Sequence, residues 1–491
     1  MLPGDIPGLH PGTRTAIEAE DRAWSYGEID ALADRFAAFF IAEGLQPGDR
    51  ASLFCANEAA LAAAYFGAFR ARVVANPINH RLLAEEAAYI LDHAGSRCVV
   101  VSDEFVPVIE KAVGMLASPP VVLKTSAVLP LPAAKREAAA DDGALLIYTS
   151  GTTGKPKGVL LTQANVMAGL AAVSRAFEMK PADRSYCVMP LFHTNGLMFS
   201  TLPYLLVGAT VILRKRFSAS GFWPQIRAAR ANIASVSPTI LAMLLEHEAT
   251  APPASEIRLD FIKVASAPTP VELAQRFEGR FGRGLLLETF GLTETTAINV
   301  MNPLRGTRKL GSIGQALAPQ EARIVDGAGE TLPTGATGEL EIRGPTVMRE
   351  YFRDPDNTRR AKHGEWLRSG DVARMDEDGF IFIVGRSKEM ILRGGENISP
   401  LEIEEVAVRH PAVREAAAVG VPDRIWGEAV GLCVVARQPV TEADLVEFCR
   451  AHLSAYKVPQ RVIFVEELPR NALGKVTRNA LRGAFSQTGM T

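Results

Sequence analysis

The stretch of this 491-residue chain with the clearest chemistry runs from Leu146 to Val159 and reads Leu-Ile-Tyr-Thr-Ser-Gly-Thr-Thr-Gly-Lys-Pro-Lys-Gly-Val. Its hydroxyls, glycines and lysines follow an apolar run, which predicts a buried strand that ends in a phosphate-binding loop. Backbone N–H groups, hydroxyl donors and lysine charge all suit a polyphosphate. The residues expected to contact phosphate are Thr149, Ser150, Gly151, Thr152, Thr153, Gly154 and Lys157.

The familiar P-loop, which also places glycines and a lysine after a strand, does not fit this spacing. In that motif two glycines five residues apart are followed by Lys and then by Ser or Thr. Here Gly154 is followed by Lys-Pro-Lys-Gly, and Pro156 disfavours a helix that starts at once. The sequence therefore argues against the usual γ-phosphoryl transfer.

Three further segments could complete a nucleotide site. The segment 290–295, Phe-Gly-Leu-Thr-Glu-Thr, follows a predicted strand, and the carboxyl edge of a doubly wound sheet is where ligands bind. Its Glu294 could hold Mg²⁺ against phosphate oxygens. Asp371 and Arg386 bracket a short β region, and a carboxylate with an arginine suits a ribose beside a phosphate. A basic loop near the end of the chain carries Lys475.

Composition limits the class of protein. A chain of 491 residues is too long for one hydrophobic core, so two or more domains are expected. A net charge of -2 and a pI near 6.5 argue against a nucleic-acid partner. The cysteines are scattered without metal-ligand spacing, which predicts reduced thiols and a cytoplasmic location. The apolar run 197–213 is short and interrupted, so no membrane insertion is expected.

The N-terminal part of the chain alternates strand and helix patterns. A capping box, Ser25-x-x-Glu28, opens a predicted helix over residues 24–44. Apolar β-like runs then alternate with amphipathic helices before and after the phosphate loop, which predicts two doubly wound, mostly parallel α/β subdomains. The expected strands are 51–55, 73–77, 97–101 and 145–148, then 186–189, 210–213, 233–236, 261–265 and 285–288.

The C-terminal part has a different sequence pattern. Between residues 320 and 384, shorter strands broken by Gly and Pro predict a small β subdomain. A compact segment with helices near 400–409 and 441–453 follows. We therefore predict an α/β protein with a large N-terminal domain over 1–385, a hinge at 386–389 and a small mobile α+β domain over 390–491.

Taken together, these segments resemble the adenylate-forming superfamily of acyl-CoA synthetases, aryl-CoA ligases, firefly luciferase and peptide-synthetase adenylation domains. The chain is most similar to a bacterial acyl-CoA ligase, and the resemblance covers nearly its whole length in the family's order. Six motifs in sequence make it highly specific. They are Tyr148 to Gly158, Pro190-Leu-Phe-His193, Phe290 to Glu294, Ser369-Gly-Asp371, Gly385-Arg-Ser-Lys388-Glu and Gly474-Lys475.

The resemblance implies ATP, Mg²⁺ and coenzyme A as cofactors and a carboxylic acid as substrate. It places the loop from Thr149 to Lys157 around the ATP phosphates, Glu294 on Mg²⁺, Asp371 on the ribose and Arg386 on the nucleotide. The residues that it implies for adenine and the α-phosphate are Ser266, Ala267, Pro268, Phe290, Gly291, Leu292, Thr293 and Thr295, although the family's glycine is replaced by Ala265 or Ser266.

The resemblance also implies a two-step reaction. The carboxylate attacks the α-phosphate of ATP, and Lys475 with Mg²⁺ offsets the repulsion between the two anions. The C-terminal domain then swings about Lys388, so that CoA can open the acyl-AMP. His193 would lie near the reacting carboxyl. Gly395, in Gly-Gly, would let the pantetheine arm pass, and Trp426 would contact CoA.

The acid is less clearly indicated by the sequence. The segments 217–223 and 306–309 look like those of ligases for small polar acids such as oxalate or crotonobetaine. However, Thr289 stands where malonyl-CoA synthetases carry an arginine, and the run 297–300 is largely apolar. We therefore expect a short to medium monocarboxylate or an aromatic acid, and a role in fatty acid or aromatic acid metabolism.

Two alternatives to free-CoA ligation stay open. The first is a stand-alone adenylation enzyme that loads the phosphopantetheine of a carrier protein, which Trp426 disfavours. The second is a non-catalytic nucleotide-binding protein, which the joint presence of Lys157, Glu294, Asp371 and Lys475 disfavours. An oligomer is compatible with the sequence.

Overall fold

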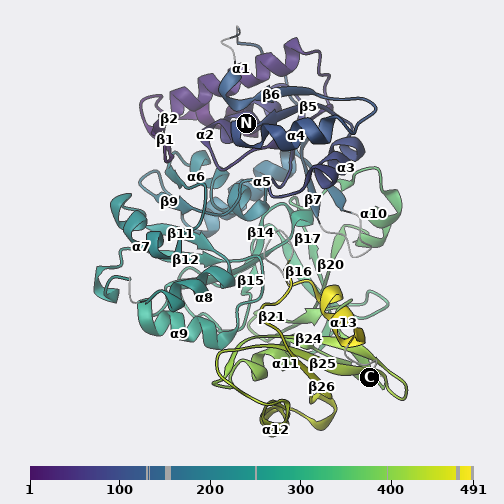
Figure 1. The fold of residues 1–491 in the computed structure, drawn as a ribbon. Coiled ribbons are helices and arrows are strands. Elements are labelled where there is room, and N and C mark those ends of the chain that lie inside the picture. The colour runs from purple at the N-terminus through teal and green to yellow at the C-terminus, as the bar shows by residue number, and fades with distance from the viewer. Residues whose placement is uncertain are drawn as a thin grey trace.

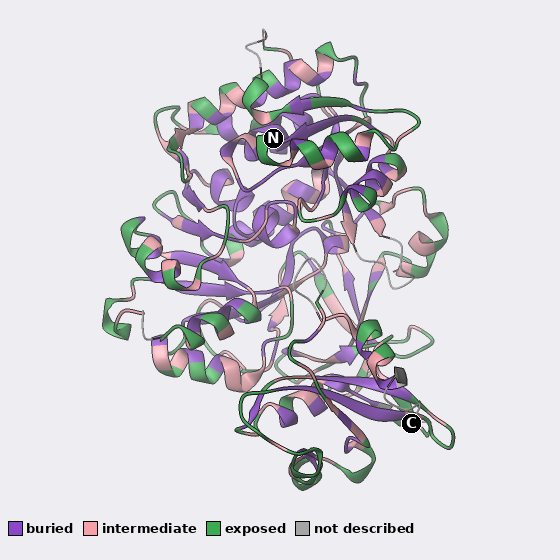
Figure 2. Ribbon diagram, viewed as in Figure 1, coloured by how far each residue is buried: buried purple, intermediate pink, exposed green. Residues whose placement is uncertain are grey.

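The computed structural model describes residues 1–128, 131, 133–149, 156–248, 251–394, 396–470 and 476–487. Within these ranges the strands form four sheets, and Figure 1 shows the C-terminal sheet at the foot of the molecule. Figure 2 shows most central strands buried, whereas the outer helices alternate buried and exposed faces. No helix in the described part of the chain is long and apolar enough to cross a membrane.

The first sheet carries the hairpin of the predicted phosphate loop. Its strand order is β18-β8-β7-β4-β3-β5-β6, with parallel pairing from β7 to β6 and antiparallel pairing of β7 with β8 and of β8 with β18. The bounds are β3 Arg50–Phe54, β4 Val74–Pro77, β5 Ser96–Val101, β6 Val121–Lys124, β7 Gly143–Thr149, β8 Lys157–Thr162 and β18 Glu350–Tyr351. The helices of this part are α1 Tyr26–Ala42, α2 Ala59–Arg70, α3 Ala84–Ala94 and α4 Val106–Val113.

The second sheet holds most of the predicted site. Its strand order is β15-β14-β13-β12-β11-β9-β10-β1-β2, parallel from β13 to β1 and antiparallel at both edges. The bounds are β1 Thr15–Glu18, β2 Ala23–Ser25, β9 Arg184–Cys187, β10 Thr210–Leu213, β11 Ile233–Val236, β12 Phe261–Val264, β13 Leu286–Gly291, β14 Ile298–Met301 and β15 Gln315–Ala316. Its helices are α6 Leu202–Leu206, α7 Ala219–Ala228, α8 Pro238–Glu246 and α9 Val271–Phe281, while α5 Gln163–Ala176 contacts both sheets.

The remaining two sheets are small. The third contains β16 Glu321–Val325, β17 Thr337–Arg343, β19 Lys362–His363, β20 Trp366–Met375 and β21 Ile381–Arg386, with helix α10 Pro355–Ala361 beside it. The fourth contains β22 Ile391–Arg393, β23 Glu396–Ile398, β24 Val413–Asp423, β25 Gly427–Ala436 and β26 Arg461–Phe464. Its helices are α11 Pro400–Ala407, α12 Glu442–His452 and α13 Arg478–Gln487.

The predicted fold class is confirmed. The capping box opens α1 as expected, because Ser25 Oγ accepts from the N–H of Glu28 at 3.2 Å and Glu28 Oε2 accepts from the N–H of Ser25 at 2.7 Å. One long-range feature differs from the expected simple repeat. Strands β1 and β2, from the first 25 residues, join the second sheet beside β10 rather than the first. That pairing crosses nearly 200 residues, and periodicity along the chain carries no information about it.

Candidate active site

The loops after β9, β12 and β13 meet at one edge of the second sheet. These strands are parallel to one another through β11, so their carboxyl ends lie on the same side. His193 lies in the loop after β9, Ser266 follows β12 and Glu294 follows β13. Ligands of open α/β sheets bind at this edge, so the predicted acid-side and nucleotide-side residues come together here.

The predicted phosphate loop joins β7 to β8. Thr149 and Lys157 are directly opposite each other at the open end of this hairpin. The loop residues Ser150, Gly151, Thr152, Thr153 and Gly154 lie outside the described residues. A strand begins at Lys157, which agrees with the exclusion of a P-loop, since that motif leads into a helix.

Glu294 is held by Tyr351, a residue that sequence analysis did not identify. Tyr351 Oη donates to Glu294 Oε1 at 2.8 Å, and Nζ of Lys157 lies 5.1 Å from the centre of the Tyr351 ring. Burial raises the pKa of Tyr351 far above its usual value, and the Glu294 carboxylate raises it further, so the hydroxyl stays a donor. Desolvation and the charge of Lys388 lower the pKa of Lys157. No local pattern marks Tyr351, because it reaches the site through the pairing of β18 with β8.

Asp371 and Arg386 form an ion pair on neighbouring strands. They are cross-strand partners on β20 and β21, and Arg386 Nε lies 2.6 Å from Asp371 Oδ1. Asp371 is almost fully buried, and its N–H donates to Ser369 Oγ at 3.0 Å. The Arg386 charge also acts on Tyr351, which connects this pair to Glu294. The structure therefore brings the residues predicted for ribose, phosphate and metal into one region.

The turn after β13 fits only glycine at position 291. A Cβ on Gly291 would lie 2.1 Å from the carbonyl oxygen of Ala297, because the turn folds back tightly onto β14. Thr295 Oγ1 accepts from the N–H of Leu292 at 3.1 Å and is fully buried, so this hydroxyl holds the turn. Thr293 is also buried, whereas Phe290 and Leu292 are partly buried. The segment thus acts as a rigid support that aims Glu294.

Asn195, another residue missed by sequence analysis, links His193, expected near the reacting carboxyl, to Ser266, expected near adenine and the α-phosphate. Its N–H donates to His193 Nδ1 at 3.3 Å, its Nδ2 donates to Ser266 Oγ at 2.9 Å, and Ser235 Oγ donates to its Oδ1 at 2.9 Å. Asn195 and Ser235 are buried. Ser266 is partly exposed with a φ of 79°, in the left-handed region that favours glycine. Ala267 and Pro268 are exposed beyond it.

The direction of this hydrogen-bond chain follows from burial. If the Asn195 amide were flipped, the fully buried Ser235 hydroxyl would lose its acceptor. In the arrangement described, Asn195 Nδ2 donates to Ser266 Oγ, so the Ser266 hydroxyl hydrogen is left to donate to another group. Ser266 is partly exposed. The chain therefore presents an O–H donor at the carboxyl edge of the sheet.

Lys388 lies in the connection between the third and fourth sheets. The turn that contains it is closed by bonds from the N–H groups of Glu389 and Met390 to the carbonyl of Arg386, at 2.9 and 3.0 Å. The Lys388 charge acts on Lys157, which places the connection beside the phosphate region. The catalytic candidate Lys475 lies outside the described residues, between β26 and α13.

Trp426 is a surface residue of the fourth sheet rather than a core residue. It is 50% exposed, and its neighbour Ile425 is 71% exposed. Gly394 packs directly against its ring, since a Cβ there would lie 2.7 Å from Trp426 Cε3, and the N–H of Gly394 donates to the Trp426 carbonyl at 2.8 Å. Gly395 lies outside the described residues. An exposed indole beside glycine is an open surface on which a ligand can lie.

Family models match both parts of the chain. The model described as "AMP-binding enzyme" matches residues 8–352, and the one described as "AMP-binding enzyme C-terminal domain" matches residues 402–475. This protein belongs to the AMP-binding enzyme family. The first match alone covers more than half of the chain, and its bounds include His193, Glu294 and Tyr351.

Individual relatives of this AMP-binding enzyme cover nearly its whole length. Sulfoacetate–CoA ligase of Cupriavidus necator is 40% identical over 474 residues, which are 93% of this chain and 91% of that protein. Oxalate–CoA ligase of Arabidopsis thaliana is 34% identical over 481 residues, with 94% and 93% covered. The ATP-bound crystal structure of MatB from Rhodopseudomonas palustris superposes with a TM-score of 0.92 at 29% identity and covers 99% of this chain and all of that one.

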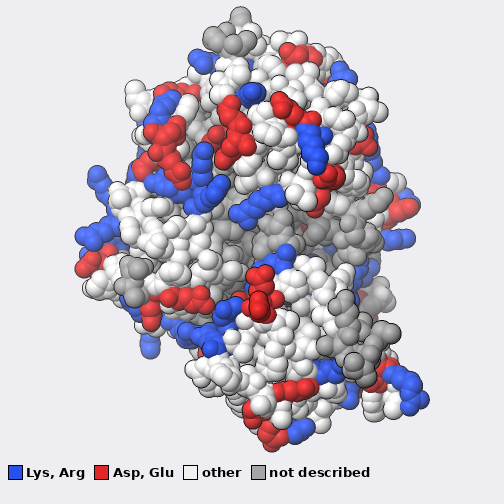
Figure 3. Space-filling model, viewed as in Figure 1, with Lys and Arg blue, Asp and Glu red and all other residues white. Residues whose placement is uncertain are grey.

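These comparisons confirm the prediction of an adenylate-forming acyl-CoA ligase. The chain is an acid–thiol ligase whose substrates include ATP and CoA. Figure 3 shows acidic and basic side chains mixed over the face of this AMP-binding enzyme that it displays, without an extended patch of one sign.

The residues of this AMP-binding enzyme fit a magnesium ion. Tyr351 engages one oxygen of the Glu294 carboxylate, which orients the other as a ligand. Within the described ranges no cluster of three or more His, Cys, Asp or Glu side chains could hold a metal. Mg²⁺ commonly binds proteins in this way, through one or two carboxylates and substrate phosphates.

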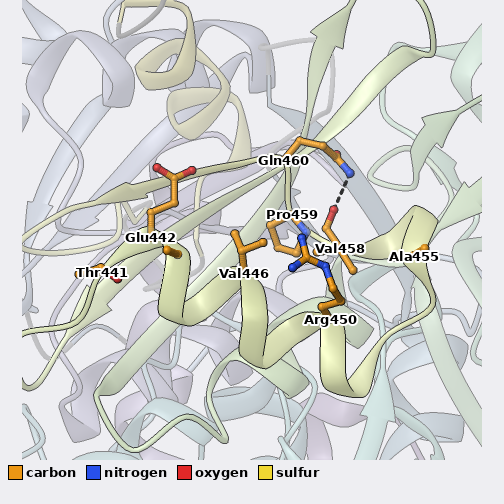
Figure 4. Close-up of a pocket in the computed structure, with 9 residues that line it drawn as sticks. Thr441, Glu442, Val446, Arg450, Ala455, Val458, Pro459 and Gln460 are labelled. Atoms are coloured by element: carbon orange, nitrogen blue, oxygen red, sulfur yellow. Dashed lines mark hydrogen bonds between the residues drawn. The ribbon is translucent and has the colours of Figure 1, made fainter.

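A groove on the C-terminal part of this AMP-binding enzyme lies apart from these residues. It has a volume of about 760 Å³ and runs between α12 and the segment 455–460 (Figure 4). Gln460 Nε2 donates to the Val458 carbonyl at 2.6 Å across one wall. Figure 1 places α12 at the far end of the C-terminal sheet, so the groove is not part of the candidate active site.

Proposed function

We propose that this AMP-binding enzyme joins a small polar carboxylic acid to CoA through an acyl-AMP intermediate. A carboxylate oxygen attacks the α-phosphorus of ATP, and the bond from that phosphorus to the bridging oxygen breaks as pyrophosphate leaves. The thiolate sulfur of CoA then attacks the acyl carbon, and AMP leaves. We further propose a cytoplasmic location and the domain limits 1–385 and 390–491 about a hinge at 386–389.

Each step needs a different set of side chains. Lys157 and the hairpin loop would hold the β- and γ-phosphates, Asp371 the ribose, and Glu294 a Mg²⁺ ion that neutralises phosphate charge. Lys475 would lie between the carboxylate and the α-phosphate, where a positive charge offsets the repulsion of two anions. His193, whose Nδ1 accepts from Asn195, would carry its proton on Nε2 and donate it toward the acid.

The observation that supports a polar acid is the chain from Ser235 through Asn195 to Ser266. It ends in the hydroxyl donor of Ser266, which the resemblance implied for adenine and the α-phosphate, and we propose that this donor instead faces an anionic or polar oxygen on the acid. The expectation of an apolar acid used both Thr289 and the run 297–300. Of that run, Ala297, Ile298 and Val300 are fully buried in core clusters. A side chain without exposed surface lines no open pocket. The sulfoacetate and oxalate ligases among the relatives support the same choice.

A panel of acids tests the proposed substrate class. We expect kcat/KM, measured by pyrophosphate release, to be at least about tenfold higher for sulfoacetate or oxalate than for butyrate or benzoate, a difference of about 1.4 kcal/mol. The Ser266→Ala variant should lose this preference and keep its activity on butyrate. A wild-type preference for the apolar acids would overturn the proposed substrate class. Stoichiometric ADP would overturn the reaction type.

Assays with and without free CoA distinguish free CoA from a carrier protein as the acyl acceptor. Trp426, half exposed against Gly394, supports free CoA because an indole face can pack on the CoA molecule. We expect acyl-CoA to accumulate with free CoA, and the Trp426→Ala variant to raise the KM for CoA while the KM for ATP stays unchanged. An enzyme that makes acyl-AMP but no thioester from free CoA would favour the carrier-protein alternative.

A further inference from the structure

Lys263 is a buried cation in the middle of the second sheet. It lies on β12 between the apolar residues Ile262 and Val264, and none of its surface is exposed. No carboxylate among the described residues forms an ion pair with it, whereas buried lysines are usually paired. An uncompensated buried charge is expensive, so the position calls for an explanation.

The lysine donates to a carbonyl that has no α-helical backbone donor. Nζ of Lys263 donates to the carbonyl oxygen of Phe199, the last residue of a π-helix over Asn195–Phe199. In a continuing α-helix that carbonyl would accept from the residue four positions later. That residue is Pro203, which has no N–H. The ammonium group therefore takes the place of the missing donor.

The π-helix is tied to the sheet at both of its ends. Ser235 and Lys263 are direct partners on the parallel strands β11 and β12, so their side chains leave the same face. Ser235 Oγ bonds Asn195 at the start of the π-helix, and Lys263 bonds Phe199 at its end. Asn195 in turn bonds Ser266, three residues beyond Lys263 on the same chain segment.

We propose that Lys263 is a positioning residue for the acid substrate. By holding the π-helix against β12, it sets the position of His193, which lies just before that helix, relative to Ser266, which follows β12. The residue itself does not contact the substrate. This inference rests on the proposed acid-side location of His193 and Ser266, but not on which acid binds there.

Charge strengthens this contact. Nζ of Lys263 lies 4.7 Å from the ring centre of Tyr204 and 5.3 Å from that of Phe177, and both rings attract a cation. Burial lowers the pKa of Lys263 to about 7. The titratable groups that face this region are Cys187, Tyr204 and Asp183, and burial keeps the Cys187 thiol and the Tyr204 phenol neutral by raising their pKa values. The ammonium form is thus present below about pH 7 and is lost as the pH rises through that value.

The pH dependence of acid binding tests the proposal. With whichever acid the wild-type enzyme turns over fastest, we expect the KM for the acid in ATP–pyrophosphate exchange to rise several-fold between about pH 6 and about pH 8.5, while the KM for ATP stays level. In the Lys263→Met variant, which keeps the length of the side chain, the KM for the acid should be raised about tenfold at low pH and should no longer change near neutrality.

Two further variants separate positioning from general stability. Pro203→Ala restores a backbone N–H facing the Phe199 carbonyl, so it should flatten the pH dependence of the acid KM and should partly restore acid binding when combined with Lys263→Met. Ile262→Val, on the opposite face of β12, should lower the melting temperature without changing the acid KM.

The outcomes decide between distinct explanations. If Lys263→Met keeps the wild-type rise in acid KM, another group titrates instead and the proposal is wrong. If Lys263→Met and Ile262→Val lower the melting temperature by similar amounts and both leave the acid KM unchanged, the lysine has only a structural role. Loss of the proposed preference for polar acids would leave these results unaffected, because the assay uses the best acid found.

Discussion

At the scale of single residues, the contact between Tyr351 and Glu294 does most to define the nucleotide side. A carboxylate intended for Mg²⁺ must be held in one orientation, since a metal site is tuned by groups that bind its ligands. Tyr351 would perform this role with a hydroxyl that burial keeps protonated, because burial raises its pKa far above the usual value. It also places a ring next to Lys157, so one residue contacts both a metal ligand candidate and a phosphate ligand candidate.

The Tyr351→Phe variant should therefore weaken metal-dependent adenylation. Loss of a hydrogen bond to a charged group costs about 1.5–3 kcal/mol, which corresponds to roughly tenfold or more in kcat/KM for ATP. ATP–pyrophosphate exchange measured over a range of Mg²⁺ concentrations should show a higher half-saturating concentration. The matched control is Tyr186→Phe, because the Tyr186 hydroxyl donates to Gln225 away from the site. This variant should leave the half-saturating Mg²⁺ concentration unchanged. An unchanged Mg²⁺ dependence in Tyr351→Phe would remove Tyr351 from the metal site.

At the scale of elements, the turn between β13 and β14 positions the Glu294 carboxylate. Its backbone folds back so closely that Gly291 faces the carbonyl of Ala297 with no room for a side chain. Thr295 closes the following 3₁₀ turn from inside, and Glu294 projects from it. This turn sets the direction in which Glu294 leaves the backbone, and the bond from Tyr351 then fixes its carboxylate.

The Gly291→Ala variant should lower both stability and adenylation. Its Cβ would lie 2.1 Å from a backbone oxygen, so the backbone must shift, and overpacking of this kind costs about 1–3 kcal/mol. Thermal unfolding and ATP–pyrophosphate exchange should both report the change. Gly279→Ala, in α9 where a Cβ meets nothing within 4 Å, should instead raise stability by roughly 0.5–1 kcal/mol. Wild-type exchange activity in Gly291→Ala would show that the turn tolerates movement.

At the scale of the whole molecule, the connection at Lys388 joins the third sheet to the fourth. The chain superposes over 99% of its length on an ATP-bound relative with a TM-score of 0.92. Lys388 lies near Lys157 in this arrangement, and Trp426 is exposed on the fourth sheet. We propose that this arrangement serves adenylation and changes before a thiol reaches the acyl group, because the first step would need Lys475 where the second would need CoA.

Substitutions at Lys475 and Lys388 should therefore impair opposite halves of the reaction. Lys475→Ala removes a charge that only adenylation uses, so ready-made acyl-AMP should still be converted to acyl-CoA. Lys388→Pro fixes φ near -65° and should hinder rotation, so ATP–pyrophosphate exchange should survive while thioester formation collapses. The two half-reactions are assayed separately for each variant. Equal losses in both halves for Lys475→Ala, or no loss for Lys388→Pro, would contradict this division of labour.

The sequence by itself determined the local structure and the identity of the enzyme. The Ser25 and Glu28 cap, the buried runs that became β3, β4, β7, β9 and β12, and the absence of a helix after the phosphate loop all depend on neighbouring residues. The motif residues Lys157, Glu294, Asp371 and Arg386 were found in the same way, because each is marked by its neighbours in the chain.

Only the tertiary structure decided which residues support that chemistry. Tyr351 reaches Glu294 through the pairing of β18 with β8, Asn195 reaches Ser266 across the sheet edge, and Lys263 reaches Phe199 from beneath it. The sequence predicted that the run 297–300 would line the acid pocket, but this run lies in the core because β14 pairs with β13. Each outcome depends on contacts between residues far apart in the chain, and local periodicity cannot encode which distant partner a strand or a side chain will meet.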